Sequence, residues 1–532
     1  MPLISLYLLL TGCYTESKYT YSATLLCTIG ASSTPKGIDS LPMPHHREGT
    51  GNSHLTISTI HKDAQKWFDQ GLNYLHGFWY LEAYRAFKEV IKYDSTCAMG
   101  HWGLAMCAPG FGGNEPIWQN SINKALKLQA SCTPFEKDLI EASAVLVNGG
   151  IAKAQTPFRN LYKKYPNQPE AIAFAAIILR QHDNATTQQE VKQLLENSFK
   201  KYPNNAALMH YYIHVMELRP DFAKAFSVTE KMLKIGKNSP HLSHMPGHLY
   251  YLVGNYEKAA KVFNQTRTQE LAYHKAENIP LSSNQNYIHN LQFLAVAQAE
   301  LNDYKTAYKT AKELAYITLS NKIPNTGAAQ MLLYEGRILP ALVAIRYWQW
   351  RDAKDELNFW LHTPDAPITN PMVRIYLQAI RAYVQGMASI TPKEGNTLVS
   401  ASKMAQDEIA IAKGAELTQL MQQFEREAMK YQQTAEFKSI NETYDILNMA
   451  RYELAGWIDN LNASKPFNDA AWQEAIKLQN LIKYDEPPRL MYPIEESLIR
   501  LHLYRNDKQA ALQAQKAALK RRPNSKLILD LI

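Results

Sequence analysis

Two pairs of histidines near the middle of this 532-residue sequence have the spacing of metal ligands on a helix. His210 and His214 lie four residues apart, and His244 and His248 repeat that pair 34 residues later. Residues four apart lie on one face of a helix. Because neutral imidazole is a good ligand for zinc, copper and nickel, each pair could present two nitrogens to one ion. Glu217, three residues after His214, could serve as a further ligand or as a general base.

Three interpretations of these histidines are open from the residues alone. They could form a transition-metal site, a polar or acid–base site for an organic ligand, or a packed internal network, since histidine packs between helices and hydrogen-bonds to Tyr and Glu. The motifs HExxH, GxSxG and GxGxxG and the phosphate-binding P-loop are absent from the sequence. Catalysis is therefore undecided, and a transition metal such as zinc is the one cofactor that the pattern suggests.

The 34-residue interval is also the period of a repeated helical hairpin. One copy runs from Ala64 to Ser95 and another from Pro240 to Leu271. Both copies have small residues at positions 8 and 20 and aromatic residues at positions 11, 17 and 24, a pattern that lets two helices pack closely. The small residues are Gly71, Ala83, Gly247 and Ala259, and the aromatic residues are Tyr74, Tyr80, Phe87, Tyr250, Tyr256 and Phe263.

The whole chain after its first part reads as helical, because no segment alternates in the manner of a strand. We expect an all-α solenoid of stacked antiparallel helix hairpins, and the two copies resemble tetratricopeptide repeats. The ordered phrases LHGFWYLEAYRAF, HYYIHVME, HMPGHLYYLVGNYEKA, NYIHN and YDEPPRLMYP also resemble a group of exported bacterial tetratricopeptide proteins. Regular repeats are expected over residues 58–320 and degenerate helical repeats over residues 321–532.

The resemblance implies that one face of each first helix lines a concave groove. In the repeat frame, the residues at the groove positions are His210, His214, Glu217, His241, His244, His248, Tyr251 and His289. Neighbouring first helices pack roughly 8–10 Å apart, so these side chains could converge. Asn290, beside His289, could serve the same site. Pro246 either loosens the turn that carries His244 and His248 or begins that helix.

A second unusual phrase, YDEPPRLMYP, contains Asp485, Glu486 and Tyr492. Two adjacent prolines cannot continue a helix, so we expect a stiff extended loop. This loop either connects two helices and does nothing more, or it folds over the groove and offers these three side chains to the ligand of the histidines.

The first residues predict export. Residues 1–12 have the form of a signal peptide, and Leu10–Cys13 matches the lipid-attachment motif of bacterial lipoproteins, with Cys13 as the lipidated residue. No Lys or Arg precedes the apolar segment, so an ordinary secretory signal is the alternative. Residues 13–57 are rich in Ser, Thr, Gly and Pro, which predicts a flexible tether.

The charge distribution bears on nucleic-acid binding, and the cysteine content bears on disulfide bonds. The 57 Lys and Arg exceed the 49 Asp and Glu, but the two signs are interspersed, so nucleic-acid binding is not expected. No CxxC pair occurs, although a Cys97–Cys132 or Cys107–Cys132 disulfide is open in an oxidising compartment.

Together these features predict an exported scaffold in the bacterial cell envelope, held at the membrane only by its N-terminal lipid. It would bind a protein or peptide partner, or another ligand, through the His-rich concave groove. The alternative is a metal-binding protein or metal-dependent enzyme that uses the same His and Glu cluster.

Overall fold

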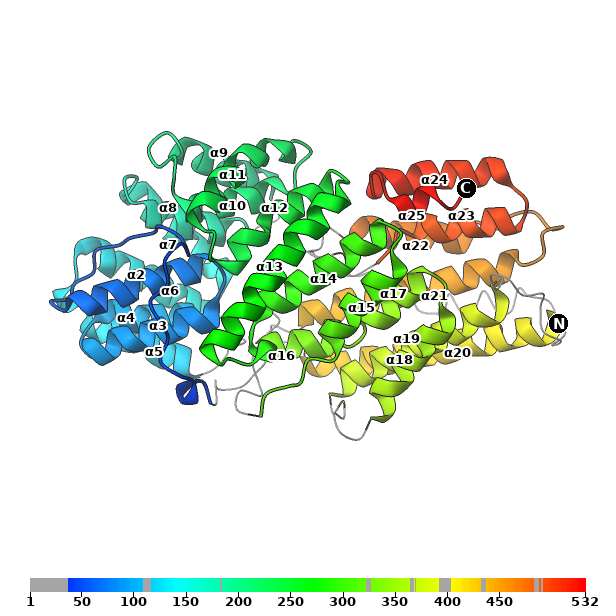
Figure 1. The fold of residues 1–532 in the computed structure, drawn as a ribbon, viewed down its shortest axis with the longest axis horizontal. Helices are drawn as coiled ribbons and strands as arrows, with labels where there is room; N and C mark the ends of the chain where they lie inside the picture. Colours follow the sequence, from blue (N-terminus) through cyan, green and yellow to red (C-terminus); the bar gives the residue numbers. More distant parts are fainter. Residues whose placement is uncertain are drawn as a thin grey trace. The chain divides into compact units, whose positions relative to one another are not determined.

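The computed structural model describes residues 37–108, 116–181, 184–321, 327–363, 368, 370–391, 403–431, 437–482, 488 and 491–532. Within these residues every regular element is helical, which confirms the all-α prediction (Figure 1). None of the described helices is long and apolar enough to cross a membrane.

The helices divide into two compact units. The N-terminal unit extends to Leu291 and includes Ile317–Leu332. Consecutive α-helices up to residue 277 pack against each other. The helices of this unit are drawn from blue to green in Figure 1. They are α2 (Lys62–His76), α3 (Tyr80–Tyr93), α4 (Ala98–Met106), α5 (Pro116–Leu128), α6 (Pro134–Gly149), α7 (Ile151–Lys164), α8 (Pro169–Leu179), α9 (Ala185–Ser198), α10 (Ala206–Met216), α11 (Phe226–Ile235), α12 (Pro240–Leu252), α13 (Tyr256–Glu277), the first part of α14 (Gln285–Glu300), and α16 (Gly327–Met331).

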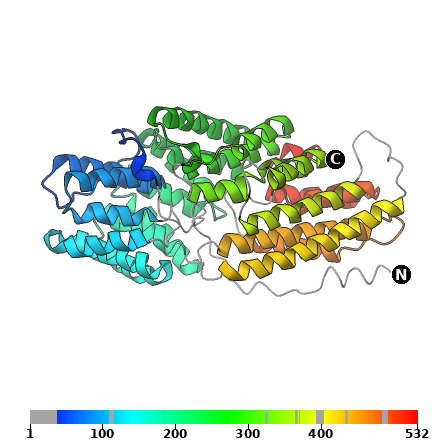
Figure 2. The ribbon, with the colours of Figure 1, turned by 90° about the horizontal axis from the view of Figure 1, so that it is seen from below.

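The C-terminal unit contains Gln292–Tyr316 and Leu333–Ile532. The long helices α19, α20 and α21, yellow to orange in Figure 2, lie side by side in it. After the end of α14, its helices are α15 (Tyr304–Ala315), α17 (Leu339–Arg346), α18 (Trp350–His362), α19 (Pro371–Ile390), α20 (Lys403–Ala428), α21 (Phe437–Asn460), α22 (Ala470–Leu481), α23 (Ile494–Tyr504), α24 (Lys508–Arg521) and α25 (Lys526–Leu529).

One turn geometry recurs between the two helices of a hairpin. The second residue after the end of the first helix has a left-handed backbone, with φ from 51° at Phe78 to 75° at Gly254. Two backbone bonds then close the helix end, as Phe78 N–H donates to Leu75 O and Trp79 N–H donates to Tyr74 O. The same arrangement occurs at Gly254, Asn302, Trp348 and Asn506. Its repetition in both units supports a repeat array that extends beyond the two copies most evident in the sequence.

The small residues of the repeat pattern lie where the two helices of a hairpin approach closely. A Cβ atom on Gly71 would lie 2.8 Å from the ring of Phe87, and one on Gly247 would lie 2.3 Å from the ring of Phe263. Both rings are fully buried. The glycines and phenylalanines that make the sequence resemble tetratricopeptide repeats are therefore the residues that pack the two helices of each hairpin together.

Part of the segment predicted to be a flexible tether, residues 37–57, is packed against the helical array. Residues 13–36, with Cys13, lie outside the described part of the chain, but residues 37–57 pack against α2. Asn73 of α2 accepts from Ser53 N–H at 2.8 Å and donates to Ser53 O at 3.0 Å. Gln65 pairs in the same way with Leu55 O and Ile57 N–H, each at 2.9 Å. Side-chain amides of α2 thus satisfy the backbone of this extended segment.

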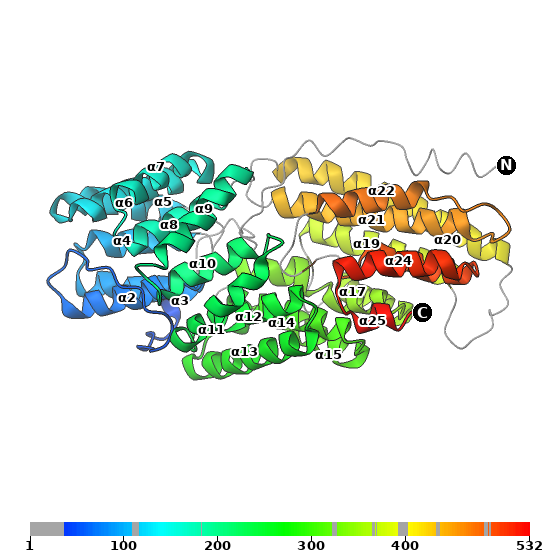
Figure 3. The same ribbon diagram turned by 90° about the horizontal axis from the view of Figure 1, so that it is seen from above.

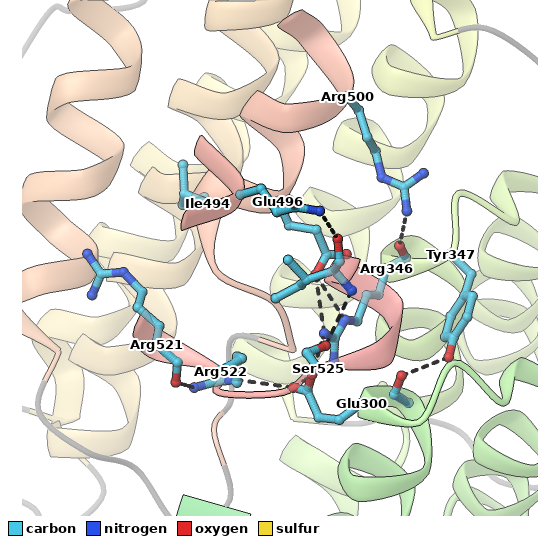
Figure 4. Close-up of polar contacts among 12 residues, drawn as sticks. Glu300, Arg346, Tyr347, Ile494, Glu496, Arg500, Arg521, Arg522 and Ser525 are labelled. Carbon is cyan, nitrogen blue, oxygen red and sulfur yellow. Dashed lines mark hydrogen bonds and ion pairs between the residues drawn. The ribbon is translucent and has the colours of Figure 1, made fainter. Parts of the chain in front are cut away.

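The C-terminal unit has a buried ion network (Figure 4). Arg346 donates to both carboxylate oxygens of Glu300, at 2.9 and 2.8 Å, and to Glu496 at 3.2 Å. Arg522 forms a further ion pair with Glu300 at 3.2 Å. Two guanidinium groups thus face two carboxylates, and the balanced charges tie α14, α17 and α23 to the end of the chain.

Candidate metal centre

The histidines predicted from the sequence meet inside the N-terminal unit. His210 and His214 lie on α10, the three histidines at 241, 244 and 248 lie on α12, and His289 lies on α14. Helix α10 packs against both α8 and α12 (Figure 3). Each of the six side chains is at most 2% exposed, so they form an internal cluster rather than a solvent-facing surface.

The six imidazoles form two groups of three. We call His210, His214 and His241 the first trio, and His244, His248 and His289 the second trio. In each trio one ring nitrogen from every histidine lies within 4.8 Å of the others. The predicted pairs 210/214 and 244/248 therefore belong to different trios, and His241 and His289 complete them.

The first trio brings three Nε2 atoms together. His214 Nε2 lies 3.0 Å from His210 Nε2 and 3.3 Å from His241 Nε2. A hydrogen bond at either distance requires a hydrogen on one of the two nitrogens. The partners of the opposite ring nitrogens decide where those hydrogens are.

The Nδ1 atoms of His210 and His214 both donate. His210 Nδ1 lies 2.7 Å from His76 O, and a carbonyl oxygen can only accept. His214 Nδ1 lies 2.9 Å from the carboxylate oxygen Oε2 of Glu217. In the neutral form of each ring the hydrogen is therefore on Nδ1, and the two Nε2 lone pairs face each other at 3.0 Å.

Burial keeps the rings of His210 and His241 neutral. It lowers the pKa of His210 and of His241 well below the ordinary histidine value, and the neighbouring imidazoles lower each pKa further. A proton shared between the two Nε2 atoms would place an imidazolium charge in this buried site, which desolvation disfavours. The Nε2 atoms of His210 and His214 thus present two converging lone pairs that a metal ion would satisfy, and the Nε2 atom of His241 lies beside them.

Helix ends supply the groups that orient the first trio. Helix α2 ends at His76, and the last carbonyl groups of a helix have no partner within it, so His76 O is available to His210. Glu217 caps the end of α10, where its N–H donates to Ile213 O and fixes the carboxylate beside His214. Hydrogen-bonded second partners of this kind set the tautomer and direction of metal-binding histidines.

Phe78 covers the first trio. Its ring centroid lies 4.7 Å from that of His210, 5.1 Å from that of His241 and 5.7 Å from that of His214. Phe78 also lines a small pocket together with Trp79–Leu81 and Ser283–Gln285. A left-handed backbone is costly for a bulky residue, so this position is held by its surroundings.

The second trio shares its orienting group with the first. His248 Nδ1 donates to Glu217 Oε1 at 2.7 Å, while Glu217 Oε2 accepts from His214. Asn290 is fully buried, hydrogen-bonds with His244, and donates to Phe263 O at 2.8 Å. Asn290 therefore belongs to the surroundings of the second trio, and both oxygens of Glu217 are occupied by histidine N–H groups.

The other predicted site residues lie elsewhere. Tyr251 is buried on α12, where its ring contacts that of Tyr256 at 5.2 Å. Tyr492 belongs to the C-terminal unit, where its hydroxyl donates to Glu453 at 2.9 Å. Asp485 and Glu486 lie outside the described residues, so the predicted loop over the site stays a prediction.

Two features bear on the alternatives left open by the sequence. Helix α12 begins at Pro240 and has Pro246 inside it, so the suggestion that Pro246 begins the helix is wrong. Pro246 has no N–H to donate to Leu242 O, which loosens the turn between His244 and His248.

Cys97, Cys107 and Cys132 are buried free thiols, so neither of the two disulfides left open by the sequence is present.

Sequence reasoning missed the roles of His76 O and Phe78. The imidazole of His76 itself bonds with Glu170 at 2.6 Å and with Tyr211 at 2.8 Å, and only its carbonyl oxygen contacts the first trio. The available signal was the phrase His76-Gly77-Phe78, where a helix ends and a glycine is followed by an aromatic residue in the turn.

Comparison with known proteins gives only distant structural similarities. No family model matches this chain, and no curated protein matches it. It is similar to the solved structure of a human IFIT1 dimer with m7Gppp-AAAA, at 12% identity, with 87% of this chain and 91% of that chain covered and a TM-score of 0.37. The APC/C hetero-tetramer Cut9-Hcn1 aligns at 10% identity over 89% of this chain and 90% of that one, with a TM-score of 0.28.

The TPR domain of P58(IPK) aligns at 11% identity over 88% of this chain and 96% of that one, with a TM-score of 0.20. These loose alignments carry no argument about ligands. The paired helices and the recurring turn by themselves agree with a tetratricopeptide-like α-solenoid, as predicted.

Proposed function

We propose that the N-terminal unit binds a late first-row transition-metal ion through the Nε2 atoms of the first trio. The spacing of these atoms carries the proposal. Two nitrogens bound to one ion at roughly 2.0–2.1 Å in tetrahedral geometry lie about 3.3 Å apart. The Nε2 distances from His214 to His210 and to His241 are 3.0 and 3.3 Å, respectively.

The donor set selects the class of ion. Three neutral imidazole nitrogens suit zinc, copper or nickel, whereas calcium and magnesium prefer oxygen ligands. Glu217 is used by His214 and His248, so its role is to orient the ligands. Three protein ligands leave a tetrahedral ion one further position, as in catalytic zinc sites.

The helical array supplies the scaffold for this centre. Tetratricopeptide-like arrays offer extended surfaces to protein or peptide partners, and the interspersed charges of this chain give no support to a nucleic-acid partner. Because the six histidines are buried, a partner would contact other residues of the array.

We further place the protein in the bacterial cell envelope, held by a lipid on Cys13. The support is the sequence of residues 1–13, with its apolar segment and terminal Leu-Thr-Gly-Cys. Incorporation of a labelled fatty acid by the chain, and its loss in Cys13→Ser, would support the lipid anchor. A secreted and unlabelled chain would support the ordinary signal.

The metal proposal is tested on chain purified without a histidine tag. Elemental analysis, followed by titration with zinc after chelator treatment, should give a bound metal at stoichiometric level. His214→Ala should reduce the affinity at least 100-fold, whereas His101→Ala, a partly exposed histidine on α4, should leave it unchanged. Wild-type chain with a native helical circular dichroism spectrum and no tight zinc or copper binding would refute the proposal, whatever the variants do.

A further inference from the structure

We infer that the second trio holds a second metal ion and that the two ions form one dinuclear centre that binds a small bridging anion. This inference rests on the metal site proposed for the first trio. It adds a second site, a coupling between the sites and a class of ligand.

The second trio has the composition of the first. His244, His248 and His289 each offer one nitrogen within 4.8 Å of the other two, and all three side chains are at most 1% exposed. His244 and His248 come from one helix at i, i+4, and His289 comes from α14. The result is a second three-histidine set drawn from two neighbouring helices.

Glu217 gives one histidine of each trio the same tautomer. Its side chain is fully buried, its Oε2 accepts from His214 Nδ1 at 2.9 Å, and its Oε1 accepts from His248 Nδ1 at 2.7 Å. Each neutral ring then carries its lone pair on Nε2, the nitrogen that points away from the carboxylate. One carboxylate thus prepares one ligand of each trio, which is a reason for both sites to be filled together.

The trios are in direct contact. The ring centroids of His241 and His244 lie 4.7 Å apart, those of His241 and His289 lie 6.1 Å apart, and those of His214 and His248 lie 6.2 Å apart. Ions held by such adjacent ligand sets would influence each other directly. The second ion would therefore belong to the same centre as the first.

Charge points to the ligand class. Two divalent ions would bring four positive charges into a buried site beside the single carboxylate of Glu217, and uncompensated buried charge is strongly unfavourable. A small anion of the hydroxide class, placed between the ions in their open positions, would lower this charge. All six histidines are buried and Phe78 packs against the first trio, which favours a small ligand over a large one.

The test uses the full untagged chain loaded with copper(II), and azide as the probe anion. We expect two copper ions per chain, an electron paramagnetic resonance signal well below that of two isolated ions because bridged ions couple, and one azide bound per two coppers. His289→Ala should bind one copper with a full signal from one uncoupled ion. A His101→Ala control should behave as wild type.

The outcomes separate the two proposals. One copper per chain in the wild type would overturn the second site while leaving the first-trio proposal intact. Two coppers with a full uncoupled signal would overturn the dinuclear centre. No bound copper would overturn the dinuclear centre, and the absence of tight zinc binding as well would overturn both proposals. These readings come from the wild-type chain, so they hold even if the His289 variant fails to fold.

Discussion

Replacing Glu217 by glutamine is the most informative single perturbation of this protein. The change keeps the size of the side chain, but it converts one accepting oxygen into an NH₂ group that can only donate. In the structure the two oxygens accept from His214 Nδ1 and His248 Nδ1, at 2.9 and 2.7 Å. Glutamine can accept from only one of the two histidines, so the other faces a second donor.

Two magnitudes follow from that geometry. A buried donor left without an acceptor costs about 1–3 kcal/mol, and about 2 kcal/mol corresponds to a fall in Tm of roughly 4–8 °C for a unit of this size. The mismatched ring can escape by moving its hydrogen to Nε2, but that removes Nε2 from the ligand set. Loss of an orienting partner of a metal-binding histidine typically weakens metal affinity about 10- to 100-fold.

The assay pairs a competitive zinc titration with thermal unfolding monitored by circular dichroism. Glu170→Gln is the matched control, because Glu170 is equally buried and lies 2.6 Å from His76 Nε2, yet the imidazole of His76 belongs to neither trio. The control should lose comparable stability while keeping its zinc affinity within about 3-fold of wild type. Equal zinc affinity in Glu217→Gln and wild type, with both folded, would refute the orienting role of Glu217.

Three further changes test other parts of the structure. Burial raises the pKa of Glu270 to about 8, so between pH 6.5 and 8 the folded state holds a proton that the unfolded state has released. The free energy of unfolding should therefore fall by about 1.4 kcal/mol per pH unit across that range. Glu270→Gln should remove this fall, as measured by denaturant titrations. Burial lowers the pKa of His274 to about 4, which adds an opposite slope only below pH 6.5. Phe78→Ala should lower the free energy of unfolding by about 3–5 kcal/mol and speed the exchange of bound metal. Phe78→Gly relaxes the left-handed backbone, so it should be about 1 kcal/mol more stable than the alanine variant. A glycine variant less stable than the alanine variant would contradict backbone strain at residue 78. Gly247→Ala should lower the free energy of unfolding by about 1–3 kcal/mol, because the new methyl group meets the buried ring of Phe263. Gly149→Ala is its control, because the methyl group there meets only the flexible side chain of Lys153. Equal stability of the two variants would argue against the close approach of α12 and α13.

The helical arrangement could be predicted from the local periodicity of the sequence. The aromatic and small residues of the first repeat predict which faces of α2 and α3 meet, because helical spacing alone fixes which residues share a face. The packing of Gly71 against Phe87 and of Gly247 against Phe263 follows that prediction. Residues 37–57 were less readable, because their pairing with Gln65 and Asn73 depends on side-chain amides that no composition rule associates with an extended segment.

The sequence by itself determined that His210 and His214 share one helix face and that His244 and His248 occupy the equivalent positions one repeat later, since a 34-residue repeat places equivalent residues at equivalent positions. Only the tertiary structure decided their grouping into two trios, because the ligand sets are formed across helices by His241 and His289. It also decided the tautomers, since His210 is oriented by the carbonyl of a residue 134 positions earlier in the chain. Glu217 changed from a candidate ligand to a shared hydrogen-bond acceptor for the same reason: hydrogen-bond partners depend on the position of whole helices, which spacing along the chain does not specify.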